Sequence, residues 1–153
     1  MKGEIVTGMD FLVAPWIFEK TGGTWNPGRG HSIGLRRDGE IVAGALYEDF
    51  NGVNMMVTLA GEGKYWLNRD FLWFMGWYPF EQVGCKRLTA LIAATNAQSI
   101  KFSEKIGFVL EATLKEAHPT GDLLVYRLMK EDCRWLKLKG DPNGKRNENS
   151  SCS

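Results

Sequence analysis

The sequence predicts a single α+β domain in which helices flank one central, twisted, mixed β-sheet. Asp38-Gly39 lies between two strand-like runs and is a strong signal for a two-residue β-hairpin. Residues 69–83 are apolar nearly all round at helical spacings, so a helix there must be covered on more than one side. The chain has 153 residues, of which 44% are hydrophobic and 24% charged, which suits one compact domain.

Three antiparallel strands in succession are expected in the first half of the chain. The hairpin joins strands over His31–Arg37 and Glu40–Glu48, and a third strand runs from about Val53 to Ala60. The aromatic-rich segment 11–18 before them predicts only one or two short helical turns, because Pro15 should interrupt a longer helix.

The second half of the chain alternates between helices and strands. A helix over Arg69–Val83 follows Asn68, a good N-cap residue, and Pro79 should kink or end it. Lys86–Ala94 is typical of a buried strand, although its alanines and leucines also permit a helix. The remaining expected elements are a helix over Asn96–Ile106 and closing strands over Phe108–Ala117 and Leu123–Lys130.

Charge and hydropathy exclude several classes of protein. Lysine plus arginine number 19 and aspartate plus glutamate number 18, so the chain lacks a general attraction to nucleic acid or anionic membranes. No apolar run reaches the ~18 residues of a membrane helix, and the N-terminus lacks the pattern of a secretion signal. We therefore expect a cytoplasmic monomer or homodimer with no membrane partner and no nucleic-acid partner.

The cysteines and the C-terminal segment carry little functional signal. Cys85, Cys133 and Cys152 show no paired spacing and form no ligand cluster with the two histidines, so we expect reduced thiols and no metal. Residues 139–153 contain no aliphatic or aromatic residue and are expected to be disordered, which leaves a domain over residues 1–138.

The helix over Asn96–Ile106 carries the most informative pattern in the chain. Asn96 can cap its N-terminus, and Gly107 supplies the left-handed conformation that ends a helix. Asn96, Ser99 and Ser103, spaced by three and four, form a stripe of short polar side chains. Such a stripe suits a narrow ligand passing along the helix, and it equally suits a capped amphipathic helix with small surface residues.

This segment resembles motif B of the GNAT superfamily of acetyl-CoA-dependent N-acyltransferases. The resemblance is strongest to the branch containing the ribosomal-protein N-terminal acetyltransferases and to compact phage-type members. That branch typically reads Gly-x-x-Arg-(aliphatic), then Asn-x-x-Ser, then Glu-Lys-x-Gly-Phe. The residues that match this pattern here are, in order, Gly84, Arg87, Leu88, Asn96, Ser99, Glu104, Lys105, Gly107 and Phe108.

The resemblance implies that acetyl-CoA is the cosubstrate, with its pantetheine in a wedge between two diverging parallel strands, here Met55–Ala60 and Lys86–Ala94. The pyrophosphate would meet the following loop and helix N-terminus, where free N–H groups favour anions. The phosphate loop of the family usually reads (Gln/Arg)-x-x-Gly-x-(Gly/Ala), whereas Ala60-Gly61-Glu62-Gly63-Lys64 stands here. The cofactor-binding residues implied in this way are Leu59, Gly61, Gly63, Lys64, Asn68, Arg69, Asn96, Ser99 and Phe102. Arg69 also fits an ordinary surface position, and Phe102 also fits the core.

The resemblance further implies direct attack of a primary amine, on a protein or a small molecule, on the thioester. Many GNAT proteins place a tyrosine acid seven residues after the motif asparagine; Ser103 stands there and could donate a hydrogen bond to the departing sulfur. Glu62 is the candidate base, and Glu48, His31 and a chain of waters are alternatives. Trp25, in a Gly/Pro-rich loop, and Glu48 are the candidate substrate-binding residues.

Two other readings remain open at this stage. A GNAT-fold protein that binds CoA or a protein partner, with weak or no catalysis, fits the missing tyrosine and the altered phosphate loop. A nucleic-acid or ribosome-binding module would use aromatic faces, but the near-neutral charge disfavours it. The orientation of Tyr126 is open. His118, like His31, is expected to be an ordinary strand or loop residue.

Overall fold

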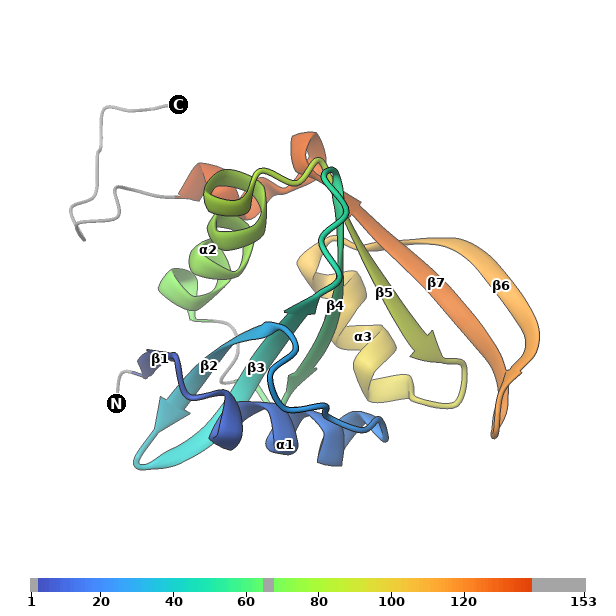
Figure 1. The fold of residues 1–153 in the computed structure, drawn as a ribbon, viewed down its shortest axis with the longest axis horizontal. Helices are drawn as coiled ribbons and strands as arrows, with labels where there is room; N and C mark the ends of the chain where they lie inside the picture. The colour runs from blue at the N-terminus through green and yellow to red at the C-terminus, as the bar shows by residue number, and fades with distance from the viewer. Residues whose placement is uncertain (1–2, 65–67, 139–153) are drawn as a thin grey trace.

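The computed structural model describes residues 3–64 and 68–138, which fold around one seven-stranded sheet of order β1-β2-β3-β4-β5-β7-β6 (Figure 1). The strands are β1 (Glu4–Thr7), β2 (His31–Arg37), β3 (Glu40–Glu48), β4 (Asn54–Gly61), β5 (Arg87–Ala93), β6 (Val109–His118) and β7 (Gly121–Met129). The helices are α1 (Asp10–Thr21), α2 (Arg69–Trp77) and α3 (Ala97–Ile106), with a π-helical turn η1 (Tyr78–Val83) and 3-10 turns η2 (Lys130–Asp132) and η3 (Arg134–Leu138). The predicted mixed sheet flanked by helices is confirmed. The predicted tail over residues 139–153 lies outside the described residues.

The first hairpin forms where it was predicted. β2 and β3 pair antiparallel, with Arg37 opposite Glu40. Asp38 and Gly39 between them both have positive φ, 53° and 84°. Positive φ at both central residues is the backbone of a type I′ turn, whose twist matches that of the flanking strands.

The prediction that segment 11–18 forms only one or two short helical turns was wrong. α1 is one continuous helix of twelve residues that contains Pro15, rather than one or two short turns. Pro15 faces solvent, while Val13 and Ile17 are fully buried against β2 and β3, so packing offsets the hydrogen bond that the proline removes. The helix approaches closely because Gly34 and Gly44 lie beneath it: a Cβ on Gly34 would stand 2.9 Å from Val13.

Strand β1 was not predicted from the sequence. Its four residues pair antiparallel with β2 at the edge of the sheet, with Glu4 opposite Arg36. Asp10, at the start of α1, accepts hydrogen bonds from the backbone N–H and the hydroxyl of Ser32, at 2.9 and 2.6 Å. These hydrogen bonds hold the N-terminus of α1 against β2, the first strand of the hairpin. Four residues carry too short an alternation to predict a strand.

The helix after β4 begins and changes as expected. The Asn68 side chain caps α2 by accepting a hydrogen bond from the Phe71 N–H at 2.9 Å. Regular α-helical geometry ends at Trp77, and the segment containing Pro79 continues as the wider η1 turn up to Gly84, whose φ is 96°. The buried Tyr47 hydroxyl donates to the Met75 carbonyl at 2.8 Å, which ties α2 to β3.

Strands β4 and β5 are parallel neighbours that separate, as the family resemblance implied. They pair at only three positions, from Asn54 opposite Arg87 to Met56 opposite Thr89. At this closed end the Thr89 hydroxyl donates to Asn54 at 2.7 Å and accepts from Arg87 Nε at 2.9 Å. Beyond it, β4 continues to pair with β3, and β5 with β7. The result is a wedge in the middle of the sheet.

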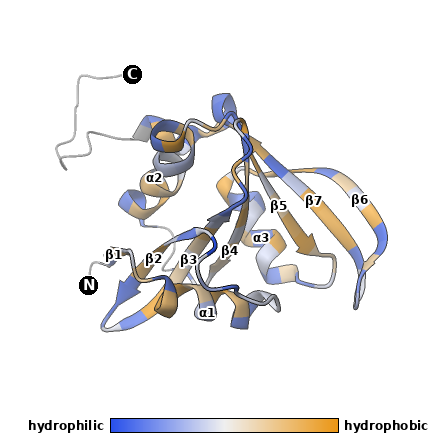
Figure 2. Ribbon diagram, viewed as in Figure 1, coloured by the Kyte–Doolittle hydropathy of each residue, from blue (hydrophilic) through white to orange (hydrophobic). Residues whose placement is uncertain are grey.

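Two hydrophobic clusters stabilise the fold, one on each face of the sheet. The larger cluster joins the strands to α2 and α3, and the smaller one joins them to α1. Figure 2 shows that β5 is hydrophobic along most of its length, as predicted for a buried strand. Within the described residues, no helix combines the length and the hydrophobicity that crossing a membrane requires.

Candidate active site

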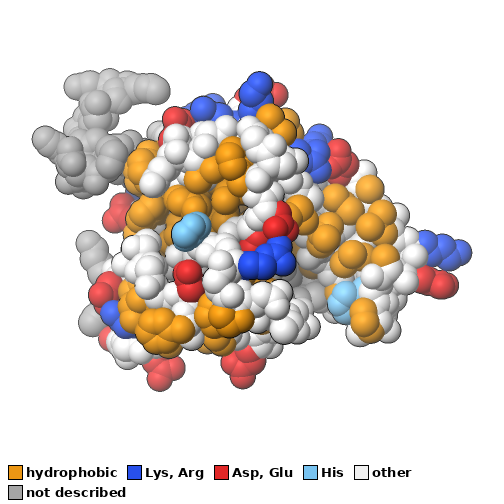
Figure 3. Space-filling view, viewed as in Figure 1, with side chains coloured by type: hydrophobic (Ala, Val, Ile, Leu, Met, Phe, Trp, Pro, Cys, Tyr) orange, Lys and Arg blue, Asp and Glu red, His pale blue; other side chains and the backbone are white. Residues whose placement is uncertain are grey.

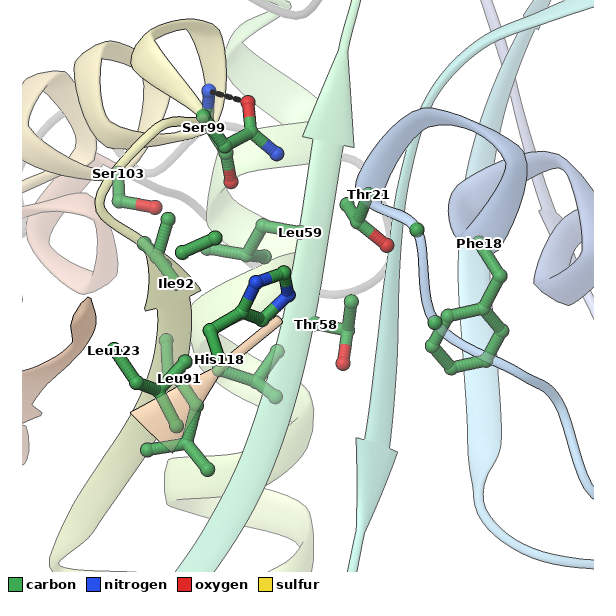
Figure 4. A pocket seen from close by; sticks show the side chains of 16 residues that line it. Phe18, Thr21, Thr58, Leu59, Leu91, Ile92, Ser99, Ser103, His118 and Leu123 are labelled. Atoms are coloured by element: carbon green, nitrogen blue, oxygen red, sulfur yellow. Dashed lines mark hydrogen bonds between the residues drawn. The ribbon is translucent and has the colours of Figure 1, made fainter. Parts of the chain in front are cut away.

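A cavity of about 200 Å³ lies where β4 and β5 separate (Figure 4). It is lined by the diverging strands, the C-terminal end of α1, one face of α3 with its N-cap residue, and the tip of the β6–β7 hairpin. Because the strands no longer pair there, the backbone edge of β4 after Met56 has no neighbouring strand on the β5 side. We call this space the wedge cavity.

Helix α3 supplies the polar side of the wedge cavity. The Asn96 side chain caps the helix by accepting a hydrogen bond from the Ser99 N–H at 3.1 Å. Asn96, Ser99 and Ser103 all line the cavity, so the predicted polar stripe faces a space for a ligand rather than bulk solvent. Ser103 is fully buried, and its Oγ has no hydrogen-bond partner among the described residues. Burying a hydroxyl without a hydrogen-bond partner costs free energy, and a molecule bound in the cavity could supply the missing partner.

The opposite side of the wedge cavity is more apolar. Phe18 and Thr21 at the end of α1, Leu91 on β5 and Leu123 on β7 line it. Leu91 is 47% exposed and belongs to the part of the sheet that α1 does not cover. Figure 3 shows hydrophobic side chains gathered over β5, β7 and β6 on this face. A molecule reaching the cavity from this side therefore crosses an apolar surface.

A second cavity, of about 310 Å³, lies at the open end of β4 and along α3. We call it the basic groove, because Lys64, Lys101 and Lys105 line it and no acidic residue does so among the described residues. A small hollow adjoins both spaces. The hollow shares Leu59, Asn96 and Ser99 with the wedge cavity, and Gly61 and Gln98 with the basic groove. The three spaces thus adjoin one another, from the electropositive groove to the middle of the sheet.

Two polar contacts border this hollow. The Gln98 side-chain amide donates to the Gly61 carbonyl at 3.0 Å, so α3 touches the end of β4 there. Lys20 at the end of α1 forms an ion pair with Glu62, immediately after β4. Glu62 therefore has a cationic partner, and its side chain does not line the wedge cavity.

Most of the predicted cofactor residues are brought together along these adjoining spaces. Those that line the wedge cavity, the hollow or the basic groove are Leu59, Gly61, Gly63, Lys64, Asn96, Ser99 and Phe102, together with the predicted catalytic residue Ser103. Phe102 combines both expectations, because it is buried in the larger cluster and also lines the basic groove. Asn68 uses its side chain to cap α2, and Arg69 is exposed and lines none of these spaces.

The predicted acceptor-side residues do not gather at the wedge cavity. Trp25 packs against the smaller hydrophobic cluster instead, because its loop folds back onto α1. Glu48 ends β3 opposite Met56, near the closed end of the wedge, and lines none of the spaces described above. His31 packs edge-on against Tyr78, with 6.3 Å between ring centroids. For Trp25 and His31 the reason is a tertiary contact that sequence spacing does not encode.

Tyr126 does not line the wedge cavity, so it does not stand in for the missing tyrosine acid. Its hydroxyl donates to the Glu104 carboxylate at 2.8 Å on the outer side of α3. Burial, reinforced by this hydrogen bond, raises the pKa of Tyr126 to about 12. Burial also raises the pKa of the Cys85 thiol. Neither side chain lines the wedge cavity.

Within the described residues, no cluster of His, Cys, Asp and Glu side chains could hold a metal ion.

His118 is the functional candidate that the sequence analysis missed. It ends β6 at the hairpin tip, and its ring lies in the wedge cavity (Figure 4). His118 is a strand residue, as expected, and the structure adds that it lines the wedge cavity. β7 pairs with β5 from Leu123 to Met129, and this pairing carries the tip back to the open end of the wedge. Sequence offers one weak signal, the tight turn at Pro119-Thr120-Gly121 directly after the histidine.

Comparison with solved structures identifies the fold. Spermidine/spermine N-acetyltransferase SpeG from Vibrio cholerae, in mutant forms, matches with a TM-score of 0.65 at 10% identity, covering 88% of this chain and 98% of that one. A GNAT-family acetyltransferase from Bacillus anthracis matches with a TM-score of 0.51 at 18% identity over 67% of each chain. A protein named "Probable acetyltransferase" matches with a TM-score of 0.57 at 22% identity over 67% of this chain, which spans 63% of that protein. No family model and no curated protein matches the sequence.

The fold and the site thus define one class of architecture. The described residues, with the parallel β4–β5 pair that opens into a wedge beside α3, have an overall fold similar to that of solved acetyltransferase structures. At these identities the likeness shows the fold of this chain. The ribosomal-protein and phage-type branches suggested by the sequence pattern stay predictions.

Proposed function

We propose that this protein is an acetyl-CoA-dependent N-acetyltransferase that acts on a primary amine of a protein or a small molecule. The observation that carries the proposal is the row of adjoining spaces, from the basic groove past the hollow to the wedge cavity, along α3 and the end of β4. A basic groove suits phosphates, and adjoining spaces along an unpaired strand edge suit the extended, amide-containing pantetheine.

The residues that line these spaces fit acetyl-CoA. Lys64, Lys101 and Lys105 would hold its phosphates, with the backbone at Gly61 and Gly63 nearby. The free edge of β4 and the Asn96 and Ser99 side chains would pair with the pantetheine amides. Acetyl-CoA, when bound, supplies the acetyl group as a thioester.

The reaction asks three things of the chain itself. The amine must be held against the thioester carbonyl carbon, so that the carbon–nitrogen bond forms as the carbon–sulfur bond breaks. The thiolate leaves with CoA, and the buried Ser103 hydroxyl is placed to donate a hydrogen bond to it. The amine proton passes to solvent, because no carboxylate or phenol lines the wedge cavity among the described residues and the Nδ1 atom of His118 already accepts a hydrogen bond from the Thr120 N–H.

Binding and turnover test the proposal separately. Acetyl-CoA should raise the midpoint of thermal unfolding in a concentration-dependent way, because a ligand of the native state stabilises it. Incubation with acetyl-CoA and a panel of amines and peptides should then release free thiol and yield an acetylated amine by mass spectrometry. No shift of the midpoint and no thiol release would refute the proposal.

The phosphate contacts have a matched control within the chain. We expect Lys101→Gln with Lys105→Gln to weaken acetyl-CoA binding about tenfold or more, since each charged hydrogen bond contributes roughly 1.5–3 kcal/mol. Arg69→Gln removes one positive charge from a side chain outside the groove and should weaken binding less than either Lys101→Gln or Lys105→Gln alone, each of which also removes one charge. A larger loss for Arg69→Gln, measured by calorimetry, would return the phosphate site to the start of α2.

One observation favours a second candidate function. The wedge cavity lacks a carboxylate and a phenol among its described residues, and Glu62 is paired with Lys20. A CoA-binding or protein-binding module of this fold with weak or no transfer would also show the thermal shift. Thiol release separates the two, because only the enzyme consumes the thioester in the presence of an amine.

A further inference from the structure

The wedge cavity contains a single ionisable side chain among its described residues. Polar hydroxyls and the Asn96 amide line it, but His118 is the only member that can carry a charge. A cavity meant to hold a dication or longer polyamine would need carboxylates to replace the water around each ammonium group. The entrance near Leu91 is apolar as well. The chemistry of the lining therefore points to an amine that arrives uncharged.

The His118 ring is held in one orientation. The Thr120 backbone N–H donates to Nδ1 at 3.1 Å, and the Thr120 hydroxyl lies 2.9 Å from the same nitrogen. The Thr120 hydroxyl is also hydrogen-bonded to Thr95 at 2.8 Å, which ties the hairpin tip to the end of β5. Because Nδ1 accepts, the neutral ring carries its proton on Nε2. Nε2 has no hydrogen-bond partner among the described residues.

This orientation makes His118 a hydrogen-bond donor toward the cavity. A donor N–H has nothing to bind on an unsubstituted alkylamine except the nitrogen lone pair that must attack the thioester. It has a suitable partner on an amine with an oxygen close by. The ring lies between β4 and β5 (Figure 4), and the Asn96 and Ser99 side chains remain for the pantetheine amides, so we assign the oxygen to the acceptor.

The basicity of the amine leads to the same class of acceptor. The α-amino group of a peptide has a pKa of about 7.7–8.0, against about 10.4 for a lysine-type alkylamine, because the adjacent carbonyl withdraws electrons. At pH 7.5 about a third of the first kind is uncharged, but only about 0.1% of the second. Without a carboxylate to remove the proton, this difference of roughly 250-fold acts directly on the rate.

We propose that the acceptor is an amine with a carbonyl or hydroxyl oxygen on the carbon next to the one that bears the amino group. The Nε2–H of His118 binds this oxygen. The proposal rests on the proposed acetyl transfer and narrows its substrate class. His118 thereby determines specificity, and Thr120 is a positioning residue that fixes the ring. Polyamines and simple alkylamines are poor acceptors.

The test uses three small amines of similar size with the wild-type protein: glycinamide, ethanolamine and propylamine, with putrescine as the polyamine probe. Acetyl-CoA is saturating, and kcat/KM is expressed per concentration of uncharged amine, which removes the effect of protonation. Each value is then divided by the rate constant of the uncatalysed reaction of the same uncharged amine with acetyl-CoA, which removes the difference in nucleophilicity. We expect glycinamide and ethanolamine to exceed propylamine about 3- to 10-fold, the value of one hydrogen bond. Equal values for glycinamide and propylamine, or putrescine as the best acceptor at pH 7.5, would overturn the proposal.

His118 variants assign the preference to the side chain. His118→Ala should lower kcat/KM for glycinamide about 3- to 10-fold and reduce the glycinamide-to-propylamine ratio toward one, whereas His118→Gln, which keeps an N–H donor, should recover part of the ratio. The thermal shift with acetyl-CoA confirms that each variant is folded. An unchanged ratio in His118→Ala contradicts the role of His118.

The failure of this inference differs from the failure of the proposed function. Thiol release with all amines and no preference for the oxygen-bearing ones refutes the acceptor class and leaves acetyl transfer standing. No thiol release with any amine refutes acetyl transfer itself. The wild-type comparison needs no variant, so it stays decisive even where a substitution at His118 prevents folding.

Discussion

The Ser103 hydroxyl is in an unusual environment, because it is fully buried beside the wedge cavity and has no hydrogen-bond partner among the described residues. Ser103→Ala removes a group that is costly to bury, so the free energy of unfolding should stay the same or rise slightly. If the hydroxyl donates to the departing thiolate, kcat should fall while the Kd of acetyl-CoA is retained.

Steady-state kinetics with a confirmed acceptor and calorimetry with acetyl-CoA make these two measurements on Ser103→Ala. Equal kcat for the wild type and the variant would remove Ser103 from the mechanism. A loss of stability would instead assign the hydroxyl a structural role.

Tyr126 gives the protein a pH dependence at the alkaline end. Its pKa is raised to about 12 by burial and by the hydrogen bond to Glu104. A phenol whose pKa is higher in the folded state contributes stability below its unfolded pKa of about 10, and this contribution is lost as the pH rises toward 12. Urea unfolding between pH 9 and 11.5 should show the free energy of unfolding falling less steeply for Tyr126→Phe than for the wild type. Parallel curves for the two proteins would contradict the assignment.

At the scale of elements, the caps of α2 and α3 form a natural comparison. The Asn68 and Asn96 side chains each accept one hydrogen bond from a backbone N–H of their own helix, at 2.9 and 3.1 Å. Either Asn→Ala substitution should cost about 1 kcal/mol of unfolding free energy. Only Asn96 lines the wedge cavity, so only Asn96→Ala should also weaken acetyl-CoA binding beyond its effect on stability.

Chemical denaturation and calorimetry on the Asn68→Ala and Asn96→Ala pair separate capping from ligand contact. Equal Kd values for acetyl-CoA in both variants would reduce Asn96 to a capping residue. A loss of affinity confined to Asn68→Ala would place the cofactor against the start of α2.

At the scale of the whole molecule, the sheet consists of two parts joined by a short seam. Three residue pairs link β4 to β5, and the Thr89 hydroxyl makes two hydrogen bonds at this seam, one to Asn54 and one from Arg87. Thr89→Val keeps the shape of the side chain and removes both bonds. We expect it to lower the free energy of unfolding by about 1–3 kcal/mol, because Asn54 and Arg87 lose a partly buried partner.

The same Thr89→Val substitution tests whether the seam sets the width of the wedge. If Thr89→Val weakens acetyl-CoA binding by more than its loss of stability accounts for, the paired end of β4 and β5 sets the width of the wedge at their open end. Ser32→Ala, which removes a hydroxyl bonded to Asp10 far from the wedge, is the matched control. A stability of Thr89→Val equal to that of the wild type would exclude an energetic role for the seam.

The sequence alone determined the order of strands and helices from β2 onward and the polar stripe on α3, whereas the parallel pair that separates was implied by the family resemblance. The first two depend on local signals: a two-residue turn, strand-like and helical runs in succession, and side chains three and four residues apart. Such signals act within one element or between neighbours, where spacing directly sets which side chains share a face.

Only the tertiary structure decided which residues share the cavity. Packing of Val13 and Ile17 against glycines of the sheet overrode the breaking effect of Pro15, and the ion pair with Lys20 engaged Glu62. The β5–β7 pairing brought His118 to the wedge cavity. These outcomes depend on contacts between residues far apart in the chain, whose energies arise only once the register of the strands and the packing of the helices are set.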